Sequence, residues 1–312
     1  MENIRKPIRN TIKKSFELTR GEDVLVITDE SKLPISKVFI NEMNSIGADV
    51  DTYLIPKEIR PIQKTTPYFD SGIETLDLII YLLENKPEEK PFRGRVVKLG
   101  RKYARVCMMP GVTEEMIEST LHVDYDELRK FTSKLTRKMN EKEKIKVTDE
   151  KGTDVEFSVK GRKFHQETGK ITRRGSYGNL PSGETFTAPV ENSFTGEIYF
   201  DHLSDFRTGK GHFKFEKGEV VEYDGVPEEL EEIMEDQNNR TIGEFGIGTN
   251  PEARPDRGFL ESEKALRTVH FAIGDSYDIG KNSSSYHYDF LIEEPTLEAD
   301  GEVIMERGKF RM

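Results

Sequence analysis

The sequence predicts an α/β N-terminal domain with a largely parallel sheet, followed by a β-rich α+β domain. Over residues 23–109, apolar strand-like runs alternate with helix-compatible segments, which is the pattern of parallel strands joined by crossover helices. Beyond residue 144, polar and apolar residues alternate around glycine turns, as in antiparallel hairpins. A chain of 312 residues is long enough for two cores. We therefore predict domains over residues 1–143 and 144–312.

The first domain begins with a strand, a helix and a second strand. Strand-like runs cover residues 23–28, 47–55, 76–83 and 103–109, and a segment with apolar residues on one helical face covers 33–45. Such a unit gives a parallel strand pair with a crossover helix. The first strand is followed by TDESKLP and not by the GxGxxG turn of dinucleotide-binding domains. The sequence therefore does not support a dinucleotide site despite the Rossmann-like order.

A charged amphipathic helix is expected before the domain boundary. Residues 124–144 carry Leu128, Phe131 and Leu135 at helical spacing, and charged residues fill the other face. We place the boundary near the end of this helix.

The second domain is predicted to contain hairpins and one acidic helix. The hairpins cover residues 145–159, around a DEKG turn, and 212–225, around EKG. The helix covers residues 226–239, with Pro227 near its first turn. We expect its carboxylates to form a solvated face.

Composition limits the classes of partner. A formal charge of -11 argues against nucleic acid or an anionic membrane surface, because binding to either needs a basic field. No segment reaches the roughly 20 apolar residues of a spanning helix, and the charged N-terminus lacks an apolar signal core. We expect a soluble, cytoplasmic protein. Cys107 is the only cysteine, which excludes an intrachain disulfide, and its apolar neighbours predict a buried thiol.

Candidate metal ligands lie in four compact blocks of the second domain. They are Glu184 in NLPSGETFTAP, Glu244 in IGEFGIGTNP, His270 in TVHFAIGDSY, and His287 with Asp289 in YHYDF. Imidazole nitrogen and carboxylate oxygen suit borderline divalent ions. Five such ligands exceed what one catalytic ion takes from protein while a position stays open for water. The set therefore predicts a metal-binding domain that holds a pair of ions.

The spacing within the blocks supports a buried site built on strands. His287 and Asp289 are separated by one residue, so on an extended strand both side chains point to the same face. Gly243, Gly246 and Gly248 allow the backbone to approach a ligand or another strand closely. Two divalent ions and three carboxylates would leave a formal charge of about +1, which a bridging hydroxide would neutralise. That hydroxide is the expected nucleophile.

The four blocks, in this order over residues 179–289, resemble the aminopeptidase T family of dinuclear metallopeptidases. Before residue 140 the chain resembles the family only in its α/β character and in GEDVLVITDE, and it is shorter than usual members. The resemblance implies a dinuclear metal-dependent aminopeptidase that removes N-terminal residues from small peptides, with two zinc, cobalt or manganese ions. It also implies a homodimer whose sites face an enclosed space.

The resemblance implies a role for each candidate ligand. Glu184 matches the metal-binding glutamate of the family's first block, and Glu244 matches that of the second. His270 matches the histidine before the A.G pattern, while His287 and Asp289 match the histidine and aspartate of the last block. Glu184 or Glu244 is also the candidate general base.

Other positions near these blocks correspond less closely to the family. Tyr277, seven residues after His270, corresponds to an active-site tyrosine and is expected to donate a hydrogen bond to the developing oxyanion. Many members carry a further glutamate before the histidine, and Glu263 is the nearest one here, with no role assigned. Gly183 stands where a second acidic residue is common, and Arg267 stands where a glycine is common. Neither departure removes a ligand.

Two alternatives stay open. Ring-cleaving dihydroxypyridine dioxygenases have a similar fold and use one ferrous ion, for which His270, His287 and Asp289 would supply two histidines and a carboxylate. A site with one iron does not require Glu184 or Glu244 as a ligand. The second alternative is a non-catalytic metal-binding relative, suggested by the short chain and Arg267. The remaining histidines are expected on the surface: His122, His165, His202 and His212.

Overall fold

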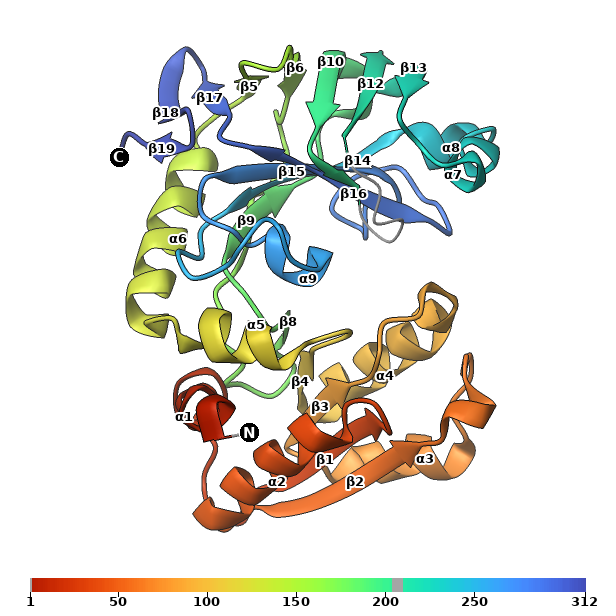
Figure 1. Ribbon diagram of the computed structural model, residues 1–312, viewed down its shortest axis with the longest axis vertical. Coiled ribbons are helices and arrows are strands. Elements are labelled where there is room, and N and C mark those ends of the chain that lie inside the picture. The colour runs from red at the N-terminus through yellow and green to blue at the C-terminus, as the bar shows by residue number, and fades with distance from the viewer. Residues whose placement is uncertain (1, 204–209) are drawn as a thin grey trace. The chain divides into compact units, whose positions relative to one another are not determined.

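The structure, a computed structural model, describes residues 2–203 and 210–312 (Figure 1). The chain forms two compact units. The first comprises residues 1–129 and 167–182, and the second comprises residues 130–166 and 183–312. The units divide within helix α6 (Tyr125–Met139), whereas the sequence places a domain boundary near the end of this helix. The boundary of an independently folding domain stays a prediction.

Over its described residues, the first unit is built on a parallel sheet of five strands in the order β2-β1-β3-β4-β8. The strands are β1 (Asp23–Asp29), β2 (Asp49–Ile55), β3 (Leu78–Leu82), β4 (Arg105–Met108) and β8 (Tyr177–Asn179). Every neighbouring pair is parallel, which confirms the predicted α/β architecture. The edge strand β8 comes from a distant part of the chain and is too short to be visible in the sequence pattern.

Helices cover both faces of this sheet (Figure 1). The helices are α1 (Glu2–Thr11), which continues as a π-helical turn over Ile12–Phe16, α2 (Leu33–Ile46), α3 (Pro67–Gly72), α4 (Lys90–Tyr103) and α5 (Glu114–Ser119). Short 3-10 turns cover Lys57–Ile59, Ile73–Thr75, Pro87–Glu89 and Thr120–His122. Val24 and Val26 of β1 share a core with α2, whereas Ile79 and Tyr81 of β3 share the opposite core with α4. Burial on both faces explains why these strands read as continuous apolar runs.

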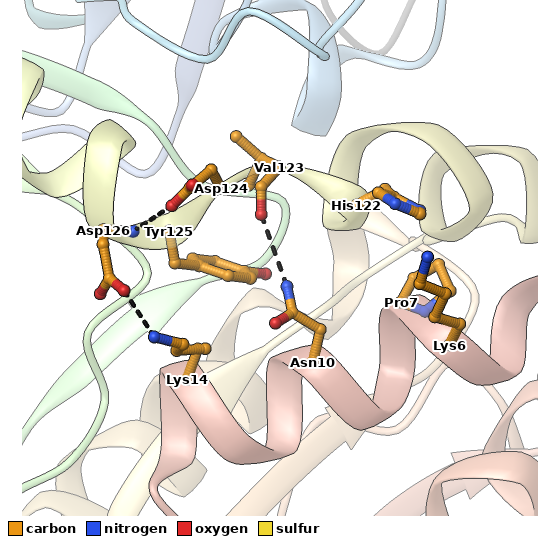
Figure 2. A pocket seen from close by; sticks show the side chains of 9 residues that line it. All are labelled: Lys6, Pro7, Asn10, Lys14, His122, Val123, Asp124, Tyr125 and Asp126. Carbon is orange, nitrogen blue, oxygen red and sulfur yellow. Dashed lines mark hydrogen bonds and ion pairs between the residues drawn. The ribbon is translucent and has the colours of Figure 1, made fainter.

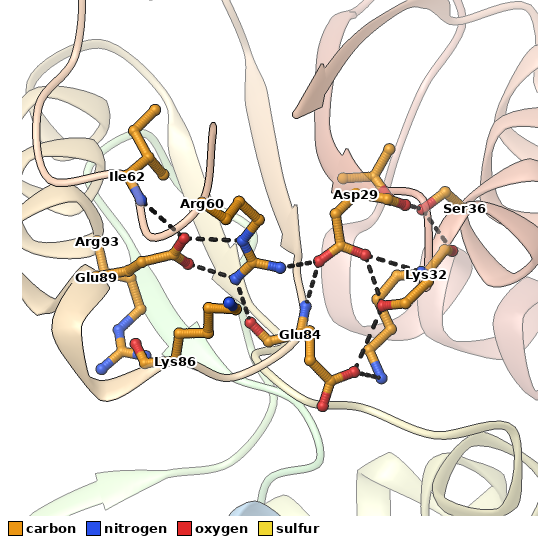
Figure 3. Close-up of polar contacts among 11 residues, drawn as sticks. Asp29, Lys32, Ser36, Arg60, Ile62, Glu84, Lys86, Glu89 and Arg93 are labelled. Atoms are coloured by element: carbon orange, nitrogen blue, oxygen red, sulfur yellow. Dashed lines mark hydrogen bonds and ion pairs between the residues drawn. The ribbon is translucent and has the colours of Figure 1, made fainter. Parts of the chain in front are cut away.

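The strand order reverses between β1 and β3, where doubly wound sheets place a ligand beyond the carboxyl ends of the strands. In this chain the side chain of Arg60 lies there (Figure 3). Its guanidinium pairs with Asp29, the last residue of β1, and Nε lies 2.8 Å from Glu89 Oε1. Arg60 also donates to the backbone carbonyl of Glu84, just beyond β3, at 2.6 Å. The three charged side chains are at most 3% exposed, so a buried ion network fills this position.

Replacing Arg60 with methionine should destabilise the protein by about 3–5 kcal/mol, because two buried carboxylates, those of Asp29 and Glu89, would lose their partner. Urea unfolding followed by circular dichroism measures the change in the free energy of unfolding. Arg95→Met is the matched control, since Arg95 is 46% exposed and pairs with Asp70 at the surface. We expect that control to change the free energy by less than about 1 kcal/mol. Equal effects of the two substitutions would contradict a structural role for the network.

Two largely antiparallel sheets form the described part of the second unit. Sheet B has the order β13-β12-β10-β6-β5-β17-β18-β19, and sheet C has the order β11-β16-β15-β14-β9-β7. The strands of sheet B are β5 (Lys144–Thr148), β6 (Asp154–Ser158), β10 (Thr195–Phe200), β12 (Gly211–Glu216), β13 (Glu219–Asp224), β17 (Thr296–Ala299), β18 (Glu302–Glu306) and β19 (Lys309–Phe310). The strands of sheet C are β7 (His165–Glu167), β9 (Glu184–Thr187), β11 (His202–Leu203), β14 (Ile242–Gly248), β15 (Thr268–Gly274) and β16 (His287–Glu293).

The two sheets share one apolar core. Val269, Phe271 and Ile273, which alternate along β15, all face this core. Phe157 of sheet B packs edge-on against Phe271, with ring centroids 5.8 Å apart. Because successive side chains of a strand point to opposite faces, His270 lies on the other face of sheet C.

Most of the local predictions for this unit are confirmed. The two predicted hairpins form as β5–β6 and β12–β13, and the charged helix forms as α6. The prediction of one acidic helix over residues 226–239 is wrong. The chain instead forms α7 (Glu228–Ile233) and α8 (Gln237–Arg240), because Asp236 begins a new helix by accepting a hydrogen bond from the Asn238 amide at 2.8 Å.

The remaining short elements are α9 (Phe259–Ser262) and a 3-10 turn over Glu191–Ser193. The thiol of Cys107 is buried in the first unit, as its neighbours predict. Among the helices of the described residues, none is both long and apolar enough to cross a membrane.

Candidate metal centre

One face of sheet C carries the predicted ligands. Glu184 lies on β9, Glu244 on β14, His270 on β15, and His287 and Asp289 on β16, which are four adjacent strands. In the strand register, Glu244 and Asp289 both lie opposite Ala272, one on each side. Small residues at such positions leave room for the longer side chains beside them. The structure thus brings together all five predicted ligands.

Glu244 reaches this face through a β-bulge. Ile242 and Phe245 of β14 both lie in the apolar core, although strict alternation would place only one of them there. The register shifts between Ile242 and Glu244, so Gly243 is an extra residue that turns the glutamate to the other face. A Cβ on Gly243 would lie 2.7 Å from the carbonyl oxygen of Gly274. Only glycine fits this bulge without moving the backbone.

Gly246 makes room for the ring of His270. The two residues lie opposite each other in the pairing of β14 with β15. A Cβ on Gly246 would lie 2.1 Å from His270 Nε2, far inside van der Waals contact. The predicted close approach to these glycines is therefore present, and at Gly246 the approaching group is the ring of a predicted ligand, His270.

His270 is the centre of the cluster. Its ring is fully buried, and Nε2 lies 3.4 Å from both Glu184 Oε2 and Glu244 Oε1. Ligand atoms of these three residues all lie within 4.8 Å of one another. The other ring nitrogen, Nδ1, is buried and has no hydrogen-bond partner among the described residues. Such a group of buried imidazole and carboxylate donors fits a divalent cation.

A second group of ligand atoms shares His270. Glu263, His270 and Asp289 also offer ligand atoms within 4.8 Å of one another. The sequence assigns no role to Glu263, which follows α9 and lies at the site with its side chain 16% exposed. Together the two groups place five donor residues around one buried centre.

A backbone hydrogen bond orients His287. Its Nδ1 lies 2.6 Å from the carbonyl oxygen of Asp275, so Nδ1–H donates and Nε2 is left to face the carboxylates. Nε2 lies 3.2 Å from Asp289 Oδ1 and 3.8 Å from Glu244 Oε2. Fixing the tautomer of a ligand through its second nitrogen is a common device at metal sites.

The carboxylates raise the pKa of both histidines. Burial alone would lower the pKa of His270, but Glu244, Glu184 and Glu263 outweigh burial and raise it to about 9. Burial also opposes the charged form of His287, whose pKa Asp289 and Glu244 raise to about 10. Burial raises the pKa of Glu263, whereas His287 and His270 hold the pKa of Asp289 below its ordinary value despite burial. Without metal, both imidazoles therefore carry a proton at pH 7.

Lys264 is a charged group of the site that sequence reasoning missed. Its side chain is 1% exposed, and Nζ lies 2.5 Å from Glu184 Oε1 and 2.7 Å from Glu263 Oε1. The only signal in the sequence is a lysine directly after the unassigned glutamate, in ESEKALRTVH.

Tyr277 lies at the rim of the site. Its ring centroid is 4.5 Å from that of His287, and the residue is 51% exposed. Tyr277 and Asp278 both have positive φ, of 46° and 66°, which is rare for residues with a side chain. The turn therefore holds the tyrosine against His287, and its role toward an oxyanion stays a prediction.

A hollow of about 340 Å³ in the first unit holds none of the predicted ligands. Figure 2 shows its wall, in which Lys14 Nζ lies 2.5 Å from Asp126 Oδ2 and Asn10 donates to the backbone carbonyl of Val123. Lysines and aspartates share this wall, so it presents no field of a single sign.

Residues 122–310 match the sequence model of the thermophilic metalloproteases, family M29. The chain belongs to this family. The match spans all the predicted ligands of the M29 chain, and it confirms the resemblance to the aminopeptidase T family and the assignment as a metallopeptidase. Among proteins with curated descriptions, none matches the M29 chain in sequence.

Among the solved structures that share the fold of the M29 chain are a dioxygenase and an AmpT protein. The 2,5-dihydroxypyridine dioxygenase of Pseudomonas putida KT2440 aligns with a TM-score of 0.78 and 17% identity, over 98% of this chain and 96% of the dioxygenase. Wild-type AmpT of Thermus thermophilus aligns with a TM-score of 0.76 and 17% identity, over 100% of this chain and 99% of AmpT. At this identity the likeness shows the fold alone.

Gly246→Ala should weaken metal binding about 10- to 100-fold, because the new methyl group would displace the ring of His270. Competition with a chromophoric chelator measures the affinity. Gly94→Ala is the control, since Gly94 lies within α4 and a Cβ there meets nothing within 4 Å. That control should keep the affinity and stabilise the helix by about 0.5–1 kcal/mol. Unchanged affinity in Gly246→Ala would exclude His270 as a ligand.

Metal binding at pH 7 should release at least two protons per chain, because His270 and His287 have pKa values of about 9 and 10 and a metal binds only neutral imidazole. The affinity should therefore rise with pH until about pH 10. In the metal-free protein, the protonated histidines add to the free energy of unfolding. This contribution is complete below the pKa of an unfolded histidine, roughly 6.5. It is lost as the pH rises through the pKa values of the folded protein, about 9 and about 10.

Titration calorimetry in buffers with different enthalpies of ionisation counts the released protons. His270→Gln should release about one proton fewer than the unsubstituted protein, since one protonated imidazole is removed. Metal binding without any proton release would show that these histidines do not bind the metal.

Proposed function

We propose that this M29 protein is an aminopeptidase that uses two divalent ions. The observation that carries the proposal is the number of donors at one buried centre, which is more than one catalytic ion takes from protein: Glu184, Glu244, Glu263, His270 and Asp289. His287 joins them through its contacts with Glu244 and Asp289. Zinc, cobalt and manganese all accept this set of nitrogen and oxygen donors.

The site has one carboxylate more than the sequence analysis assigns. With Glu263 included, four carboxylates surround the centre, and two divalent ions balance their charge. When bound, two such ions polarise the scissile carbonyl and generate a nucleophile from a shared water. Glu184 or Glu244 would accept the proton of that water, since both face the centre of the cluster.

The rim of the site supports a role in binding the substrate. Glu184 and His270 are almost fully buried, whereas Glu263 is partly exposed and Tyr277 is more than half exposed. The exposed members mark the side from which a peptide would enter. Its free α-amine would bind beside the acidic cluster, and Tyr277 would donate a hydrogen bond to the oxyanion. Small peptides are the proposed substrates, and the homodimer and cytoplasmic location stay predictions.

A one-iron dioxygenase is the competing function, because the solved dioxygenase has the same fold. His270, His287 and Asp289 would suffice for such a site. Glu184, Glu244 and Glu263 favour the peptidase, since a mononuclear iron site has no use for three further buried or half-buried carboxylates.

Glu244→Ala should lower kcat for release of the N-terminal residue from short peptides by about 10²- to 10⁴-fold, because the substitution removes a proposed ligand and candidate base. The assay follows the free amino acid released, with protein purified without chelator. Glu222→Ala is the matched control, since Glu222 is an exposed glutamate that pairs with Lys214 on a hairpin.

The metal content of the same preparation separates the two functions. About two zinc, cobalt or manganese ions per chain, with hydrolysis of a free peptide and not of its N-acetylated form, is the expected result. One iron per chain and no peptide hydrolysis would favour the dioxygenase. Retention of hydrolysis by Glu244→Ala, with normal metal content, would contradict the assignment of Glu244.

A further inference from the structure

The buried ammonium group of Lys264 contacts two carboxylates of the proposed site. Its side chain is 1% exposed, and burial of a charge is costly unless partners compensate. The partners are Glu184, on strand β9, and Glu263, which follows α9. Two carboxylates from separate elements thus share one ammonium.

Lys264 contacts one oxygen of each carboxylate, and in Glu184 the other oxygen faces the cluster. Nζ lies 2.5 Å from Glu184 Oε1, while Glu184 Oε2 lies 3.4 Å from His270 Nε2 and faces the cluster. On the other side, Nζ lies 2.7 Å from Glu263 Oε1. An oxygen that accepts a hydrogen bond from an ammonium is a weaker metal ligand than the other oxygen of the same carboxylate.

The backbone around Lys264 is fixed on both sides. The Lys264 amide donates to the carbonyl of Glu261 at 3.0 Å, and the Lys264 carbonyl accepts from the Asn250 amide at 2.8 Å. Asn250 is the second residue after the end of β14. The backbone of Lys264 is therefore tied to the chain just beyond the strand that carries Glu244, and its ammonium is held by Glu184 and Glu263.

Charge balance gives the ammonium a second effect. Two divalent ions balance the four carboxylates of the site, so a hydroxide nucleophile would add an uncompensated negative charge. One buried ammonium beside Glu184 and Glu263 compensates that charge.

We propose that Lys264 is a positioning residue that holds one oxygen of Glu184 and one of Glu263, so that each carboxylate presents a single oxygen to the ion pair. This inference rests on the proposed two-ion function. Without the ammonium, both carboxylates are free to chelate through two oxygens, which raises the coordination number and fills the positions that water and substrate need.

Cobalt-loaded protein tests the inference, because the visible absorption of Co²⁺ weakens as its coordination number rises. We expect Lys264→Met to bind two cobalt ions per chain, to lose at least half of the visible absorption per ion, and to lower kcat about 10- to 100-fold. Lys264→Gln keeps an N–H donor without the charge and should give an intermediate spectrum. Lys32→Met is the control, since Lys32 is a buried lysine that pairs with Glu84 in the first unit, and its spectrum should equal that of the unsubstituted protein.

The outcomes separate this inference from the proposed function. A spectrum of Lys264→Met equal to that of the unsubstituted protein overturns the inference. If Lys264→Met does not fold, Lys264→Gln decides: a weakened spectrum with two ions supports positioning, and an unchanged spectrum overturns it. Failure of both to fold, with Lys32→Met folded, shows a purely structural ion pair and overturns it as well. A single cobalt site, or no peptide hydrolysis, in the unsubstituted protein instead contradicts the proposed function.

Discussion

The alternation of side chains along β15 places the apolar core on one face of sheet C and the proposed metal site on the other. Phe271 and its neighbours at every second position fill the core between the sheets, which leaves His270 on the opposite face. The core therefore fixes the strand backbone from one side, while the ring of His270, a predicted ligand, is buried on the other. A ligand on the central strand of a packed sheet has little freedom to move, which is what a preorganised metal site needs. The adjacent strands add their donors to the same face.

The cost of this arrangement is a concentration of buried charge. Two imidazoles, four carboxylates and one ammonium lie on a single face of sheet C. Buried charges are tolerated only when they compensate each other, and here His270 and Lys264 each contact two carboxylates. The first unit holds its buried ions differently, since Arg60 pairs with both Asp29 and Glu89, and their side chains fill the place beyond the strands.

The sequence predicts the parts of this structure that depend on local pattern. His287 and Asp289 share a face because one residue separates them on a strand, and the register of β16 with β15 agrees. The bulge at Gly243 could not be predicted, because it exists only relative to the partner strand. The placement of Glu263 and Lys264 at the site likewise could not be predicted from local pattern. They reach the site through a turn whose position depends on backbone hydrogen bonds to Asn250.

The register shift in β14 also bears on how such a centre arises. In a regularly paired strand, a glutamate at position 244 would point into the core, where an isolated carboxylate is not tolerated. With one additional residue, the strand keeps both of its flanking core side chains and turns the glutamate outward. One extra residue in a buried strand therefore changes which face carries the acidic side chain, while the apolar core on the other face stays filled.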